Sequence, residues 1–76
     1  MKEIITYRKQ DARRLKKVIE AYCRARSLPI AETVRIYQGE RQVLVSDQLL
    51  GWQTLENLIG KVQDRIKVVR EYDYRR

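Results

Sequence analysis

The stretch that decides the fold is T-V-R-I-Y-Q-G-E-R-Q-V-L-V, residues Thr33–Val45. Apolar β-branched residues alternate with polar ones on both sides of Gly39-Glu40, and a two-residue loop that begins with glycine is typical of a β-hairpin. We therefore predict two paired strands, Thr33–Gln38 and Arg41–Val45. Pairing Gln38 with Arg41 sets the register. The residues that then share the core face of the hairpin are Val34, Ile36, Val43 and Val45.

The segment before the hairpin predicts a strand followed by a helix. Residues Glu3–Arg8 are rich in β-branched and aromatic side chains, as strands are. From Asp11 to Arg26 the apolar period changes to that of an amphipathic helix, with Asp11 as N-cap or first-turn acid and Pro29 beyond its end. The apolar stripe of this helix consists of Leu15, Val18, Ile19 and Tyr22, with Cys23 beside it as a small buried residue.

The segment after the hairpin repeats the helix–strand order. Asp47–Gly51 is a connector, and a second apolar stripe at helical spacing follows, which Gly60 weakens. Arg65–Tyr72 reads as the last strand. The second stripe consists of Trp52, Leu55, Leu58, Ile59 and Val62, and Trp52 is expected to pack in or near the core.

The element order is therefore β-α-β-β-α-β in a single domain, residues 1–76. With right-handed crossovers, this order predicts a ferredoxin-like sandwich, a four-stranded antiparallel sheet with two helices on one face. The first and last strands are neighbours in this arrangement.

Composition argues against catalysis and metal binding. The 76 residues include no histidine and a single cysteine, Cys23, which removes the commonest general base and the usual zinc ligands. We therefore expect no enzymatic activity, no cofactor and no metal. No apolar run reaches the length that a bilayer requires, and the N-terminus lacks the apolar core of a signal peptide. We expect an intracellular protein that does not bind membranes, cytoplasmic or, in a eukaryote, nuclear.

Positive charge gathers at the two ends of the chain. The net charge is +7, and residues 1–26 contain nine basic and three acidic residues. Residues 65–76 contain five basic and two acidic residues, whereas the middle of the chain is slightly acidic. Because the predicted fold places the first and last strands side by side, the two basic ends should merge into one positive region. Such a region favours a polyanionic partner.

The candidate nucleic-acid-binding residues belong to three predicted surfaces: the basic face of the first helix, the exposed sheet face and the last strand. On the sheet face, an aromatic side chain among basic ones suits single-stranded nucleic acid. The alternative is a solvated helix face with ion pairs such as Lys16–Glu20, and an apolar sheet patch for a partner chain. The candidates are Arg8, Lys9, Arg13, Lys16, Lys17, Arg24, Arg35, Tyr37, Lys67 and Arg70.

Residues 14–41 also resemble a known family. The run L-K-K-V-I-E-A-Y-C-R-A-R-S-L-P (Leu15–Pro29) is similar to the helix of the small ubiquitin-like modifiers, and R-I-Y-Q-G-E-R (Arg35–Arg41) to the strand and turn that follow. The resemblance implies a β-grasp fold, as the alternative to the ferredoxin-like one, and a module that docks an extended peptide at a sheet edge. The chain departs from the family by lacking a hairpin before the helix and a di-glycine at the end.

The sequence thus predicts a small basic, non-catalytic binding module whose partner is RNA or DNA. An acidic protein surface, or a homodimer formed through the sheet, is the second hypothesis. An enzyme or a small-molecule sensor domain is the third, and a pocket lined by convergent polar groups would favour it.

Overall fold

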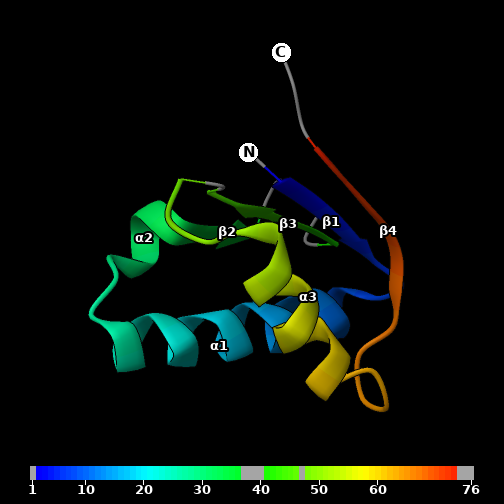
Figure 1. Ribbon diagram of the computed structural model, residues 1–76. Coiled ribbons are helices and arrows are strands. Elements are labelled where there is room, and N and C mark those ends of the chain that lie inside the picture. The colour runs from blue at the N-terminus through cyan, green and yellow to red at the C-terminus, as the bar shows by residue number, and fades with distance from the viewer. Residues whose placement is uncertain (1, 37–40, 47, 74–76) are drawn as a thin grey trace.

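The computed structural model describes residues 2–36, 41–46 and 48–73, with residues 69–73 described by their backbone (Figure 1). The prediction of a small α+β domain with helices and an antiparallel sheet is confirmed. In chain order the elements are β1 (Lys2–Thr6), α1 (Lys9–Arg26), α2 (Ile30–Thr33), β2 (Val34–Ile36), β3 (Gln42–Val45), α3 (Trp52–Lys61) and β4 (Val68–Asp73).

The strands lie in the order β2-β3-β1-β4, and each neighbouring pair is antiparallel. The first strand of the chain therefore pairs with the last one. The predicted hairpin register is confirmed in two pairs, Val34 opposite Val45 and Ile36 opposite Val43. The predicted Gln38–Arg41 pair and the Gly39-Glu40 turn lie outside the described residues.

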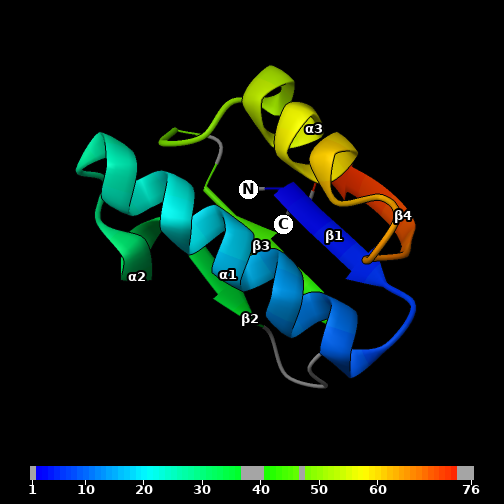
Figure 2. The same cartoon turned by 90° about the horizontal axis from the view of Figure 1, so that it is seen from below.

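The core lies between the sheet and the two long helices, α1 and α3, which cover the same face of the sheet (Figures 1 and 2). Both predicted apolar stripes point into it, and Cys23 is fully buried as expected. Trp52 packs, partly buried, against the same core. The sheet contributes Ile4, Val34, Val43 and Val45, and the helices contribute Leu15, Ile19, Leu55, Leu58 and Ile59.

The connection from β1 to α1 lies two residues earlier than predicted, because β1 ends at Thr6 and α1 begins at Lys9. The cause is the fully buried side chain of Thr6. Its hydroxyl lies 2.9 Å from the carbonyl oxygen of Arg8 and 3.0 Å from that of Arg41. This contact turns the chain out of the sheet before Arg8, which caps α1 with extended backbone angles. Asp11 is consequently a first-turn acid and not the N-cap.

The short helix α2 was not predicted, since Thr33 was assigned to the strand that follows. Thr33 belongs to the helix because its hydroxyl donates a hydrogen bond of 2.6 Å to the carbonyl oxygen of Pro29, one turn earlier. Pro29 itself precedes the helix with extended angles, as its fixed φ favours. The β2 strand therefore begins one residue later than predicted, at Val34.

The last strand begins at Val68 and not at Arg65. Backbone N–H groups of Arg65 and Ile66 both donate to the carbonyl oxygen of Val62, at 2.9 and 2.8 Å. These bonds continue α3 as a turn, and they direct the side chain of Ile66 into the core, where it is 3% exposed. This turn forms one wall of the site described next.

Candidate functional site

A groove of about 690 Å³ lies between α1 and the turn that leads from α3 to β4. Basic side chains predominate among its charged lining residues, and they come from the two basic ends of the sequence. Three apolar side chains lie among them. The lining residues are Arg8, Arg14, Lys17, Val18, Val62, Asp64, Arg65 and Ile66.

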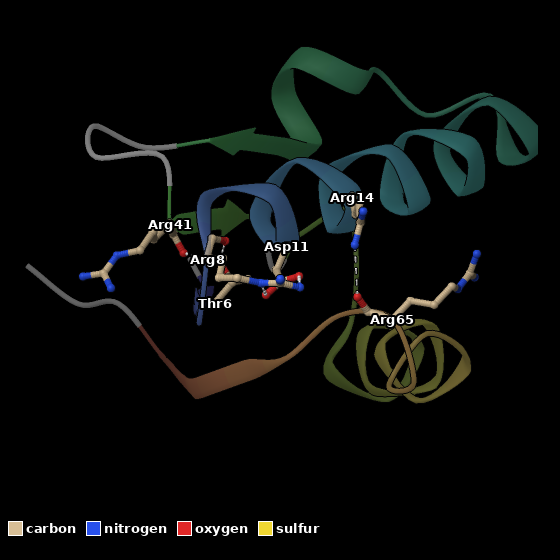
Figure 3. Close-up of polar contacts among 6 residues, drawn as sticks. All are labelled: Thr6, Arg8, Asp11, Arg14, Arg41 and Arg65. Atoms are coloured by element: carbon tan, nitrogen blue, oxygen red, sulfur yellow. Dashed lines mark hydrogen bonds and ion pairs between the residues drawn. The ribbon is translucent and has the colours of Figure 1, made fainter.

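Arg8, at the start of α1, is held by the buried carboxylate of Asp11 (Figure 3). Its Nε donates to Oδ2 at 3.3 Å and its Nη2 to Oδ1 at 3.2 Å. The hydrogen bonds and charge of Arg8, aided by the backbone N–H groups of Lys67 and Arg8, hold the pKa of Asp11 below its usual value, although burial acts to raise it. The same contact raises the pKa of Arg8. Nη1 of Arg8 remains outside this ion pair, and the side chain is 54% exposed.

Arg14 reaches across the groove from α1 to the opposite wall (Figure 3). Its Nη1 lies 3.5 Å from the carbonyl oxygen of Arg65, at the long end of the hydrogen-bond range, in an exposed position. A contact of this length and exposure holds the side chain only weakly. The guanidinium of Arg14 is therefore available to a stronger acceptor, such as a phosphate.

Asp64 offsets one of the four positive charges that line the groove. Its carboxylate lies 4.0 Å from Nε of Arg65, and the two side chains are 81% and 68% exposed. An ion pair this long and this accessible to water is weak, so it does little to hold the side chain of Arg65 in place. The groove therefore remains a positive site.

The groove brings together only some of the predicted residues. Arg8 and Lys17 lie in it, whereas Arg14 and Arg65, which line it too, were absent from the predicted set. A sequence signal for Arg14 exists, because it precedes Lys17 and Val18 by three and four residues and so shares their side of the helix. Arg65 is the first residue of the basic C-terminal segment.

A second, shallower depression of about 470 Å³ lies on the other side of α1, towards β2. It contains two predicted residues, Lys16 and Arg35, next to Ala31, Val34 and Ile36. Lys16 forms the expected ion pair with Glu20, at 3.6 Å, so its charge is partly balanced. The depression is therefore less positive than the groove.

Four of the remaining predicted residues have described side chains, and none of the four lines either site. Lys9, Arg13 and Arg24 are exposed on α1, and Lys67 is exposed just before β4. The backbone of Arg70 pairs with that of Ile5 in the sheet. Tyr37 lies outside the described residues, so the aromatic part of the prediction stays a prediction.

The sheet face opposite the helices has an acid and an apolar residue near its centre. Residues Arg35, Leu44, Glu3 and Tyr72 occupy one row across the four strands. Within that row Glu3 and Leu44 are nearly buried, at 3% and 7% exposure. Of the two alternatives for β1, the structure places Ile5 on this face, since Ile4 and Thr6 are fully buried on the core side. An acid and an apolar side chain at its centre make this face a poorer site for phosphates than the groove.

The described part of the chain contains no group of three His, Cys, Asp or Glu side chains able to hold a metal ion. In the same residues, no helix has the length and apolar character needed to cross a bilayer. Compared with protein-family models, curated proteins and solved structures, the chain gives no match. The resemblance to small ubiquitin-like modifiers therefore stays a prediction.

Proposed function

We propose that this protein is a small, non-catalytic binding module that contacts nucleic acid through the basic groove. The observation that carries the proposal is the convergence of Arg8, Arg14, Lys17 and Arg65 on one groove. Three of these residues come from the basic N-terminal third and the fourth from the basic C-terminal segment. A groove lined by cations concentrates positive potential and attracts phosphates.

We further propose that the fold is the ferredoxin-like sandwich. Support comes from the antiparallel pairing of β1 with both β3 and β4, and from the position of α1 and α3 on the same sheet face (Figure 2). The β-grasp fold implied by the resemblance to ubiquitin-like modifiers is the alternative. The ferredoxin-like arrangement is widely reused, so it supports a binding role only together with the groove.

The arginines suit a phosphate backbone because a guanidinium can donate two hydrogen bonds to one phosphate. Lys17 adds a point charge on the α1 wall of the groove. Neutralising phosphates releases condensed counterions, so the affinity should fall steeply as salt rises. This salt dependence separates phosphate binding from recognition by an apolar surface.

The test is a fluorescence anisotropy titration of labelled RNA and DNA oligonucleotides, single- and double-stranded, at several salt concentrations. Lys17→Glu in the groove is compared with Arg35→Glu, on the far side of α1, since both substitutions change the net charge equally. At about 0.1 M salt, where screening acts beyond roughly 10 Å, we expect Lys17→Glu to weaken binding about tenfold and Arg35→Glu less than about threefold.

Two outcomes would overturn the proposal. Affinities no better than millimolar at low salt for every oligonucleotide would show that nucleic acid is not the partner. Equal losses in Lys17→Glu and Arg35→Glu would show that the groove is not the contact site.

A second candidate function is protein interaction, either with an acidic protein surface or between two copies of this chain. The sheet order favours it, because β2 and β4 are the outer strands and each has one neighbour within the sheet. An outer strand can pair with a further strand. Light scattering coupled to size exclusion distinguishes the two functions: a stable dimer that ignores nucleic acid supports this one.

A further inference from the structure

The floor of the basic groove is apolar. Val18 of α1 is half-buried and lines the groove together with Val62 and Ile66, which are 4% and 3% exposed. These three side chains line the same groove as the cations. A site that served phosphates alone would gain nothing from them, because a phosphate is fully polar and binds through hydrogen bonds and charge.

The groove is large enough for more than a phosphate. Its volume of about 690 Å³ falls within the range of roughly 300–1,000 Å³ typical of pockets that enclose small organic ligands. A ligand that fills it has to offer a flat apolar surface to the floor and negative charge to the walls. A nucleotide meets both requirements, since its base has an apolar face and its phosphates are anionic.

A duplex cannot use this floor. Its bases are stacked and paired inside the helix, so only sugars and phosphates reach a protein groove without distortion. A single strand can turn one base out at little cost. The combination of apolar floor and basic walls therefore favours a single strand over a duplex.

We propose that the groove holds one nucleotide of a single-stranded nucleic acid, with its base against the apolar floor and chiefly against Val18, since Val62 and Ile66 are nearly buried. The flanking phosphates then lie against Arg14 and Lys17 on one wall and Arg65 on the other. Arg14 releases the carbonyl oxygen of Arg65, 3.5 Å away, when a phosphate approaches. This inference rests on the proposed function, and it names the kind of nucleic acid that the same groove takes.

The test measures the affinity of the unaltered protein for three ligands of equal length. They are a single-stranded oligonucleotide, its duplex, and a single strand of abasic residues. We expect the single strand to bind about tenfold more tightly than the duplex. The abasic strand keeps its phosphates and should bind about fivefold more weakly, because an aliphatic floor contributes at the lower end of the range for base contacts. Its salt dependence should stay the same.

A matched pair of variants tests the floor. Val18→Thr keeps the side-chain shape but adds a hydroxyl, and Val68→Thr makes the same change at another half-buried valine, outside the groove. We expect Val18→Thr to reduce the preference for single strands about threefold, as expected for a partly lost apolar contact, and Val68→Thr to retain it. Thermal melts of both variants confirm folding, and the abasic comparison requires no variant.

The outcomes separate this inference from the proposed function. If the duplex binds as tightly as the single strand, or the abasic strand as tightly as the normal one, the base is not in the groove and the inference is wrong, while nucleic-acid binding stands. If no oligonucleotide binds at all, the proposed function fails and the inference fails with it.

Discussion

The guanidinium of Arg8 and the fully buried carboxylate of Asp11 face each other through two hydrogen bonds, of 3.3 and 3.2 Å. The carboxylate also accepts a backbone hydrogen bond from Lys67, so it links the start of α1 to the beginning of β4. Asp11 thereby fixes Arg8 at the end of the groove and joins the two basic segments of the chain.

The first prediction is a loss of stability in acid that depends on Asp11. The pKa of Asp11 is lower in the folded protein than in the unfolded chain, where it is about 3.9. Its stabilising contribution is therefore complete above that unfolded value and disappears as the pH falls through the folded pKa. We expect Asp11→Asn to reduce the free energy of unfolding by about 1 kcal/mol at neutral pH, since exposure of Arg8 to water weakens the pair. Urea denaturation at pH values from acid to neutral measures this.

Asp64→Asn is the matched control for Asp11→Asn. Asp64 is 81% exposed and lies 4.0 Å from its partner Arg65, so its loss should leave stability unchanged at every pH. If Asp11→Asn kept the same loss of stability in acid as the unaltered protein, the assignment of that loss to Asp11 would be wrong.

The second prediction concerns Ser27, at the end of α1. Ser27 has a left-handed backbone, with φ 58° and ψ 36°, and the N–H of Leu28 donates to the carbonyl oxygen of Cys23 at 2.8 Å. Glycine is the residue that this helix terminus favours. We expect Ser27→Gly to raise the free energy of unfolding by about 0.5–1 kcal/mol in urea denaturation. Ser27→Ala, whose Cβ meets the same strain, should change little; a gain equal to that of glycine would contradict the explanation.

The third prediction compares two glycines. Gly60 lies within α3 and Gly51 is its N-cap, and a Cβ added at either position would meet no atom of another part of the described chain within 4 Å. Helical backbone favours alanine, so Gly60→Ala should stabilise the protein by about 0.5–1 kcal/mol. Gly51→Ala should not, because alanine is a poor N-cap residue. Thermal and urea unfolding of both variants test this. An equal gain at Gly51 would show that the stabilisation comes only from the lower conformational entropy of the unfolded chain and not from helical backbone.

The parts of the fold that follow from local periodicity could be predicted from the sequence. The two-residue turn at Gly39-Glu40 predicted the hairpin register, the alternation of Val34 and Ile36 with polar residues predicted its core face, and helical spacing identified α1 and α3. The α2 helix was missed because Thr33 has a β-branched side chain typical of strands. The hydrogen bond from its hydroxyl to the carbonyl oxygen of Pro29 depends on the local backbone geometry, which residue propensities for helix and strand do not describe.

The candidate site was harder to predict, because it forms between distant segments. Arg8 and Lys17 could be selected as basic residues of the first helix. The place of Arg14 and Arg65 in the same groove depends on how the turn after α3 packs against α1, and the buried Val62 and Ile66 set that packing. The sheet face was predicted as the second basic surface from Arg35 and Lys67. The nearly buried Glu3 at its centre was overlooked, since an acid in a strand of alternating pattern reads as solvent-exposed.

The last prediction rests on the proposed function. It is that a basic residue adds to the counterions released on nucleic-acid binding only if it lies in the groove. Arg14 lies in the groove, whereas Arg24 is exposed on the same helix about three turns further along. We expect Arg14→Gln to reduce the slope of log affinity against log salt by about 1, because one phosphate contact is lost. Arg24→Gln, which removes the same charge from the same kind of surface, should leave the slope unchanged. Anisotropy titrations over a salt series measure both slopes, and a flatter slope in Arg24→Gln would place the phosphates along the outer face of α1 instead.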